Sequence, residues 1–179
     1  MTRSAIITTP LGEMLAAADE GGLTGLWFAG QKHFPDTCDF MKVHDDPLFA
    51  NLQKELDRYF AGRLTVFSVP INLRGAPFQL VVWEELLRIP FGKTTTYGRI
   101  AETLFSAAKS AERIKRVSAR AVGGAVGHNP ISILAPCHRV IGHNGKLTGY
   151  AGGLWRKEKL LSLEGHAGFA LQGTAIISV

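Results

Sequence analysis

The sequence predicts an α/β N-terminal domain followed by a mainly α-helical C-terminal domain. Three observations support this division: short apolar segments give way to a helical period near residue 74, Gly and Pro mark that point, and the net charge changes sign there. A chain of 179 residues is long enough for one or two small domains with a buried core. We expect the domains to span residues 1–73 and 74–168, with a tail of unknown structure at 169–179.

Three short strands are expected at the start of the N-terminal domain, because apolar segments alternate there with turn residues. The segments are Ser4–Thr9, Met14–Ala18 and Leu23–Phe28. A helix follows, which Asp46 and Pro47 begin and Gly62 ends. Its apolar positions are Leu48, Leu52, Leu56, Tyr59 and Phe60. We expect one more strand, Val66–Val69, and we recognise no catalytic group of residues in this domain.

Helices are expected in the C-terminal domain. After Pro77 an apolar stripe runs through Phe78, Val81, Val82, Leu86 and Ile89. Thr96 can cap a helix from Tyr97 to about Phe105, and Ser118 can cap another. Two such helices in a basic region suggest a helix-turn-helix, although any small helical domain contains similar pairs. The connection between them, Ser106–Val117, is long for that motif.

Charge is unevenly distributed along the chain. Residues 1–72 hold six Lys and Arg against nine Asp and Glu, a net charge of −3, whereas residues 73–179 hold fourteen against six, a net charge of +8. A basic second half indicates a polyanion partner or, equally, a solvated basic surface. The helix after Ser118 is rich in small residues, which either pack against another element or let the backbone approach DNA, with Arg120 projecting.

The two cysteines, Cys38 and Cys137, form no repeated spacing, so neither a disulfide framework nor a zinc ribbon is indicated. This usage suits a reducing compartment, and the N-terminal segment is too short for a signal peptide or a membrane span. We therefore expect an intracellular protein with no membrane partner.

Cys137 is the candidate reactive residue, because His138 and Arg139 follow it directly. Positive charge or a base near a thiol favours the nucleophilic thiolate. A Cys–His pair also occurs in thiol hydrolases such as peptidases, but no oxyanion motif is recognisable and the basic half favours a nucleic-acid partner.

An ordered series of motifs resembles the O6-alkylguanine-DNA alkyltransferases, also called methylated-DNA–protein-cysteine methyltransferases. The motifs are 120–125, 129–130, 136–140, 145–147, 149–153 and 157–164. The resemblance is dense from Phe78 to Glu164, apart from one segment, and looser in the N-terminal domain. It implies a ribonuclease H-like N-terminal domain and a winged helix-turn-helix in the C-terminal domain. It also implies DNA repair without a cofactor, in which the alkyl group of O6-alkylguanine in duplex DNA moves irreversibly to Cys137 in a single turnover. O4-alkylthymine is a second candidate substrate.

The resemblance assigns roles around the cysteine. His138 takes the thiol proton through a bound water, Glu164 orients His138, Asn129 braces the turn, and Tyr97 donates toward the guanine. Taken alone, Glu164 is an ordinary helix-end carboxylate, Tyr97 a half-buried aromatic and Asn129 part of a turn. The implied substrate-binding residues are Tyr97, Val140, Tyr150, Gly152 and Gly153.

The resemblance also implies how DNA is bound. Flipping a base out of the duplex costs a few kcal/mol, and Arg120 would fill the vacated space. The other implied DNA-binding residues are Gly98, Ala121, Gly124 and Arg139. Arg139 could equally be a structural ion-pair partner. We expect a monomer, located in the cytoplasm with the nucleoid, or in the nucleus of a eukaryote.

Two departures from the family pattern stand out. The segment Ser106–Val117 is longer than usual, and it carries Lys115 and Arg116, expected phosphate contacts. His33, Cys38 and His44 do not match the spacing of the zinc ligands found in some members, so we expect no metal. A non-catalytic branch that binds alkylated DNA is an alternative, although its members lack the cysteine.

Overall fold

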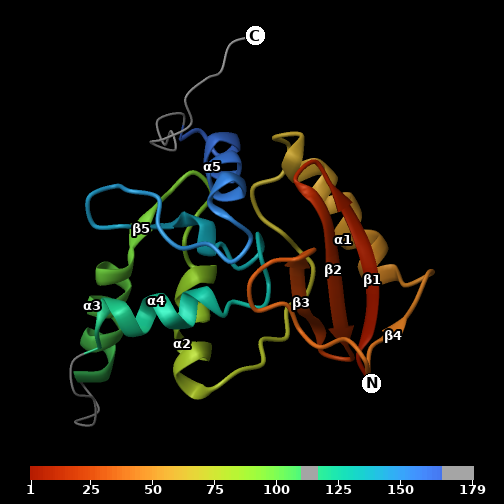
Figure 1. The fold of residues 1–179 in the computed structure, drawn as a ribbon, viewed down its shortest axis with the longest axis horizontal. Helices are drawn as coiled ribbons and strands as arrows, with labels where there is room; N and C mark the ends of the chain where they lie inside the picture. Colours follow the sequence, from red (N-terminus) through yellow and green to blue (C-terminus); the bar gives the residue numbers. More distant parts are fainter. Residues whose placement is uncertain (110–116, 167–179) are drawn as a thin grey trace.

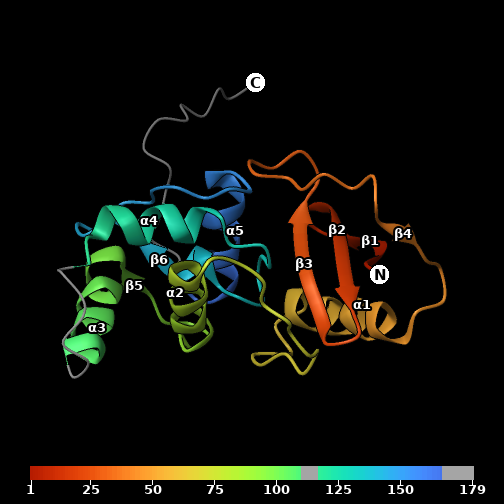
Figure 2. The same ribbon diagram turned by 90° about the horizontal axis from the view of Figure 1, so that it is seen from below.

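The computed structural model describes residues 1–109 and 117–166. Two halves lie side by side: a sheet covered by one helix, and a group of helices around a short strand pair (Figures 1 and 2). We call residues 1–73 the sheet half and the rest of the described chain the helical half. The segment 110–116 and the tail 169–179 of the sequence analysis lie outside the described residues.

The sheet half is built on the three predicted strands, which are confirmed. They are β1 (Arg3–Thr9), β2 (Gly12–Asp19) and β3 (Gly22–Phe28), joined as antiparallel neighbours. The two-residue strand β4 (Met41–Lys42) pairs parallel with β1, which gives the order β3-β2-β1-β4. Gly12 and Gly22 end the two hairpin turns with φ of 111° and 126°, values that favour glycine.

Helix α1 (Pro47–Phe60) covers one face of this sheet (Figure 2). The Leu48 N–H donates to Asp46 Oδ1 at 2.9 Å, and Pro47 occupies the first turn, where a missing N–H costs nothing. The side chains of Leu52, Leu56 and Tyr59 are fully buried against the sheet. The predicted helix is therefore confirmed at both ends.

The predicted strand Val66–Val69 is wrong. The carboxylate of Glu55 accepts the backbone N–H of Ser68 at 2.9 Å and that of Val69 at 3.3 Å, so these donors are used by a side chain and not by a neighbouring strand. Val66 is 76% exposed. Among the described residues, this region pairs with the sheet in strand geometry at one place, the isolated bridge between Ile71 and Leu23.

The helical half contains four α-helices and two short strands in its described part. They are α2 (Pro77–Leu87), β5 (Thr95–Thr96), α3 (Tyr97–Lys109), α4 (Ala119–Gly127), β6 (Val140–Ile141) and α5 (Leu154–Leu163), with a 3-10 turn at Cys137–Arg139. Both predicted caps are confirmed: Thr96 Oγ1 accepts the Arg99 N–H at 3.2 Å, and Ser118 Oγ accepts the Ala121 N–H at 3.1 Å.

Two expectations for these helices need correction. The buried face of α2 is formed by Val82, Trp83 and Leu86, whereas Phe78 and Val81 are 38% and 42% exposed. This face packs on the apolar side of α4, and the Trp83 indole N–H donates to the Ala125 carbonyl at 2.9 Å. In addition, α3 continues to Lys109, so the first residues of the expected connection 106–117 are helical.

The two halves share backbone hydrogen bonds along the free edge of β3. The Leu26 N–H donates to the Pro130 carbonyl at 2.8 Å, and the Ser132 N–H donates to the Leu26 carbonyl at 2.9 Å. Ile131 and Ile133 are part of the same apolar core as the sheet. The chain that leads to Cys137 is therefore fixed on the sheet half. No described helix is long and apolar enough to cross a membrane.

Candidate active site

The turn that carries the cysteine, residues 129–137, is held by one amide. The buried Asn129 Nδ2 donates to the carbonyls of Ile131 at 3.2 Å and Ala135 at 2.7 Å, and Asn129 Oδ1 accepts the Ile131 N–H at 3.1 Å. Ile133 has a φ of 70°, which is strained for a β-branched residue and persists only where surrounding contacts impose it. These bonds explain how the turn keeps a single shape. We call it the cysteine turn.

Cys137 lies at a cavity of about 440 Å³, which we call the pocket. Tyr97, Gly124 and Tyr150 also line the pocket, so four of the predicted site residues meet there. Burial raises the pKa of the Cys137 thiol, and the Asn129 amide and the Lys157 charge oppose this shift without cancelling it. The resting residue is therefore a thiol, and it needs a base to become a thiolate.

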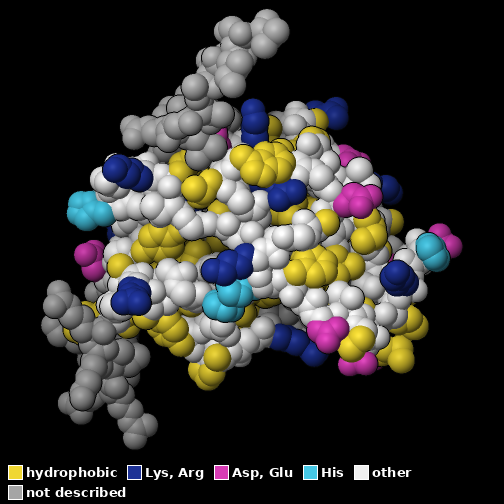
Figure 3. Space-filling model, in the orientation of Figure 1, with side chains coloured by type: hydrophobic (Ala, Val, Ile, Leu, Met, Phe, Trp, Pro, Cys, Tyr) yellow, Lys and Arg dark blue, Asp and Glu magenta, His cyan; other side chains and the backbone are white. Residues whose placement is uncertain are grey.

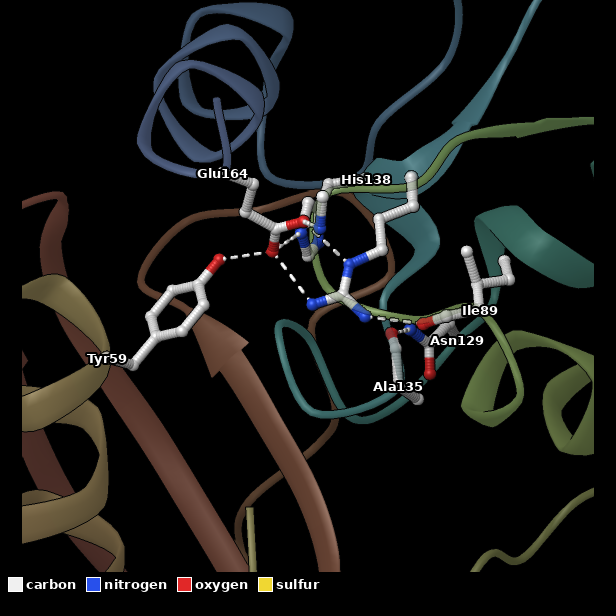
Figure 4. Close-up of polar contacts among 8 residues, drawn as sticks. Tyr59, Ile89, Asn129, Ala135, His138 and Glu164 are labelled. Atoms are coloured by element: carbon white, nitrogen blue, oxygen red, sulfur yellow. Dashed lines mark hydrogen bonds and ion pairs between the residues drawn. The ribbon is translucent and has the colours of Figure 1, made fainter. Parts of the chain in front are cut away.

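His138 can supply that base (Figure 4). Its Nε2 donates to Glu164 Oε1 at 2.9 Å, because a carboxylate only accepts hydrogen bonds. Burial lowers the pKa of His138, and Glu164 only partly offsets this effect. The neutral ring thus carries its hydrogen on Nε2 and a lone pair on Nδ1. Nδ1 is buried and has no hydrogen-bond partner among the described residues.

Glu164 is the most heavily bonded side chain of the site. Its Oε1 accepts from Tyr59 Oη at 2.7 Å, His138 Nε2 at 2.9 Å and Arg139 Nη2 at 2.8 Å. Its Oε2 accepts from Arg139 Nε at 2.8 Å and the Gly92 N–H at 3.2 Å. Burial alone would raise the pKa of Glu164, but the hydrogen bonds from His138 and Arg139 hold that pKa well below its usual range. The carboxylate therefore stays ionised and fixed.

Tyr59 was not found by sequence reasoning, which treated it as an apolar position of its helix. It reaches Glu164 from α1 of the sheet half (Figure 4). Burial, followed by the Glu164 charge, raises the pKa of the phenol far above its usual value, so the hydroxyl stays a donor. No sequence signal distinguishes this tyrosine from a core residue.

Lys157 was also missed. It is fully buried, and its Nζ donates to the carbonyls of Val140 at 2.6 Å, Thr148 at 2.7 Å and Gly149 at 3.3 Å. Burial lowers the pKa of Lys157 to about 8, and the nearby Cys137 opposes this shift. A signal did exist, because a lysine three and four residues before two buried leucines lies on the apolar face of its helix.

The prediction that Arg139 contacts DNA is wrong, and the ion-pair alternative is correct. Arg139 is only 6% exposed. Its Nε and Nη2 donate to Glu164, and its Nη1 donates to the Ile89 carbonyl at 2.6 Å. A guanidinium buried in this way cannot reach a phosphate.

Of the predicted substrate residues, Tyr97 and Tyr150 line the pocket, whereas Gly152, Gly153 and Val140 do not. The Tyr97 hydroxyl donates to the Thr148 carbonyl at 3.1 Å, and the Tyr150 hydroxyl is buried. A Cβ on Gly152 would lie 2.8 Å from the Phe28 ring, so only glycine fits there. Gly153 has a φ of 92°, which favours glycine. Val140 does not line the pocket, since its side chain is buried in the core of the helical half.

The predicted DNA-binding residues other than Arg139 lie at or near the surface. Arg120, Ala121 and Gly124 are exposed on α4, and Gly98 is half-buried at the start of α3. On the face shown in Figure 3, acidic side chains lie mostly over the sheet half, whereas Lys and Arg side chains are spread over both halves. Within residues 1–109 and 117–166 there is no group of three or more His, Cys, Asp or Glu side chains that could hold a metal ion.

A buried thiol followed by a histidine that an ionised carboxylate holds in place is typical of a protein that uses a cysteine as its nucleophile. Comparison with known protein families identifies the family. The profile of the 6-O-methylguanine DNA methyltransferase DNA binding domain matches residues 77–166, and that of the ribonuclease-like domain of the same proteins matches residues 2–73. The chain belongs to the 6-O-methylguanine DNA methyltransferase family.

Individual relatives support this assignment. The methylated-DNA–protein-cysteine methyltransferase of Mycobacterium tuberculosis is 44% identical over 158 residues, 88% of this chain and 89% of that one. The protein of the same name from Methanosarcina acetivorans is 45% identical over 161 residues, 90% of this chain and 97% of that one. The crystal structure of Mycobacterium tuberculosis OGT in complex with DNA has a TM-score of 0.80 and 43% identity, covering 91% of this chain and 93% of that one.

Proposed function

We propose that Cys137 is the residue through which this chain performs its family's activity, DNA repair by transfer of an alkyl group to a protein cysteine. The observation that carries the proposal is the arrangement at the pocket: a buried thiol at Cys137, an unpartnered Nδ1 on the next residue, His138, and an ionised Glu164 bonded to the other nitrogen of that ring. Sulfur is the softest nucleophile among the side chains, which suits attack on a saturated carbon.

The transfer begins with a proton. His138 takes the Cys137 proton on Nδ1 through a bridging water, and the imidazolium is stabilised by Glu164. The Lys157 charge near the sulfur favours the thiolate during this step.

The substrate is O6-alkylguanine in duplex DNA, flipped into the pocket. The S–C bond to Cys137 forms as the C–O6 bond breaks, and the guanine leaves with the bonding electron pair and then regains a proton. Tyr97 is the donor for the base, because burial raises the pKa of its phenol and keeps the hydroxyl protonated. Donation to the base requires its hydroxyl to leave the Thr148 carbonyl. The thioether has no bond that water can cleave, so each molecule reacts once.

DNA is held by a helix-turn-helix formed by α3 and α4, with the β5–β6 pair as part of its wing. The exposed Gly124 leaves open space where a Cβ would stand, so the backbone of α4 can approach the minor groove. Arg120, in the first turn of α4, enters the space left by the flipped base. The sheet half is a ribonuclease H-like domain, with the boundary near residue 73, and the protein acts as a monomer on chromosomal DNA.

Mass spectrometry tests the assignment. The protein is incubated with a duplex that contains one O6-methylguanine, and intact mass and peptide mapping are measured. We expect one methyl group on Cys137 and no turnover beyond one equivalent. Cys137→Ser should bind the duplex and accept no methyl group, whereas the control Cys38→Ser, which removes the exposed cysteine, should react as the wild type does. Catalytic turnover would indicate a hydrolase, and tight binding without transfer would indicate a non-catalytic binder.

A further inference from the structure

We propose that Lys32, His33 and His128 form a phosphate-binding site at the rim of the pocket, in which the sheet half supplies two of the three side chains. We call these residues the rim cluster. All three line the pocket that contains Cys137, and all three are exposed. This inference rests on the proposed function, because it requires a nucleotide to enter the pocket.

The segment that carries Lys32 and His33 is held rigidly in place. Gln31 is buried, its Oε1 accepts the Phe28 N–H at 2.9 Å, and its own N–H donates to the Phe28 carbonyl at 3.1 Å. The Lys32 N–H then donates to the Ala151 carbonyl at 3.1 Å, which attaches this turn to the segment that forms the pocket wall. The sheet half is thus part of the pocket entrance and not a remote scaffold.

His33 shows backbone strain at this point. Its φ of 58° lies in the left-handed region, which only a few per cent of residues other than glycine adopt, with histidine among the more frequent of these. Strained residues of this kind persist where the surroundings impose them, and they are concentrated at binding sites. Here the conformation directs the His33 ring across the boundary between the halves, onto the ring of His128 at the end of α4.

The two imidazole rings stack with centroids 3.9 Å apart and an interplanar angle of 31°. His128 Nδ1 lies 2.8 Å from the Gly124 carbonyl, and a carbonyl can only accept, so this nitrogen carries the hydrogen. Lys32 adds a third basic group beside the pair. Positive charges gathered this closely repel one another, and a phosphate bound beside the stacked rings and the ammonium would reduce that repulsion.

The chemistry of the pocket identifies that anion. When the base of a nucleotide reaches Cys137, its sugar and flanking phosphates stay at the pocket entrance, because they are attached to the outer side of the base. No Asp or Glu lines the pocket in the part of the chain that the structure describes, so nothing there repels a phosphate. An exposed Lys side chain is a common phosphate partner, and the N–H of an imidazole can donate a hydrogen bond to a phosphate oxygen. The rim cluster therefore fits the backbone phosphate next to the flipped nucleotide.

The experiment compares two substrates that differ in phosphate. The second-order rate of alkyl transfer is measured for wild type, Lys32→Ala, His33→Ala and His128→Ala with an O6-methylguanine duplex and with free O6-benzylguanine base, which has no sugar or phosphate. The control is Lys42→Ala, which removes an exposed lysine from β4, outside the pocket. We expect slower transfer from DNA and an unchanged rate with the free base for the rim variants, and wild-type rates for the control.

Salt dependence gives a second readout. Each lost phosphate contact should reduce the steepness of a plot of the logarithm of the rate against the logarithm of the salt concentration by about 0.9. When salt is raised from 50 to 200 mM, the rate of transfer from DNA should therefore fall about threefold less for Lys32→Ala than for wild type. Equal losses with both substrates would indicate a damaged pocket and overturn the proposal, as would wild-type rates and slopes with DNA. If the proposed function itself were wrong, wild-type protein would not transfer the group from either substrate.

Discussion

Replacing Glu164 with glutamine should destabilise the protein strongly, because this carboxylate holds a buried cation. Glu164→Gln keeps the shape of the side chain but removes its charge, and the amide nitrogen cannot accept the hydrogen bonds that one carboxylate oxygen receives. Arg139, 6% exposed, would then have no counterion. Removing one partner of a buried ion pair costs about 3–5 kcal/mol, so we expect the free energy of unfolding to fall by about that amount.

Urea denaturation followed by tryptophan fluorescence measures this loss, as a lower midpoint at an unchanged slope. The matched control is Glu85→Gln, which breaks the pair with Arg88, whose side chain is 69% exposed. The Glu85 side chain is 16% exposed, so this pair lies at the surface, where such a pair is worth about 0–1 kcal/mol. The double variant Glu164→Gln/Arg139→Met removes the stranded charge and should recover at least about 1 kcal/mol relative to Glu164→Gln. A loss for Glu164→Gln no larger than that of the control would refute the reasoning.

Three further predictions concern the same site. Tyr59→Phe should cost about 1.5–3 kcal/mol, the value of a hydrogen bond to a charged group, and should slow methyl transfer. Ser4→Ala, which removes a buried hydroxyl from β1, should leave the transfer rate unchanged. Because the pKa of Glu164 is lowered in the folded state, its contribution to the free energy of unfolding is present above its unfolded pKa of about 4.3 and is lost as pH falls. The urea midpoint of the wild type should therefore decline below that pH, and the midpoint of Glu164→Gln should decline less steeply. Lys157→Met should raise the pKa of the Cys137 thiol further. In a Cys38→Ser background, the pH midpoint of the reaction of Cys137 with iodoacetamide should therefore move upward. An unchanged midpoint would mean that the ammonium does not act on the sulfur.

Local signals in the sequence were reliable where a residue acts on its own neighbours in the chain. Asp46, Thr96 and Ser118 cap helices as expected, because a cap needs only the next three residues. The strand at Val66–Val69 failed for the opposite reason: its N–H groups are taken by Glu55, more than ten residues away, which no local pattern reveals.

The chemistry of the site could be predicted only as far as the motifs extend. Cys137, His138 and Glu164 lie together, but the sequence could not show that Tyr59 from the sheet half completes the set of donors on Glu164. The sequence predicted equally that Arg139 contacts DNA or forms a structural ion pair, and only its burial decides between these two interpretations. Residues whose role depends on a partner distant in sequence need the folded structure.

The pairing of β3 with the cysteine turn also bears on whether the chain can be divided. An unpaired strand at a sheet edge invites pairing with other chains and aggregation. Here the β3 edge is covered by Asn72, Pro70 and residues 130–132, partly from beyond the boundary between the two family profiles. Cutting the chain near residue 73 would uncover part of that edge and expose Leu26, which is fully buried in the intact protein. We therefore expect the two regions that separate family profiles match to depend on each other for solubility in this protein.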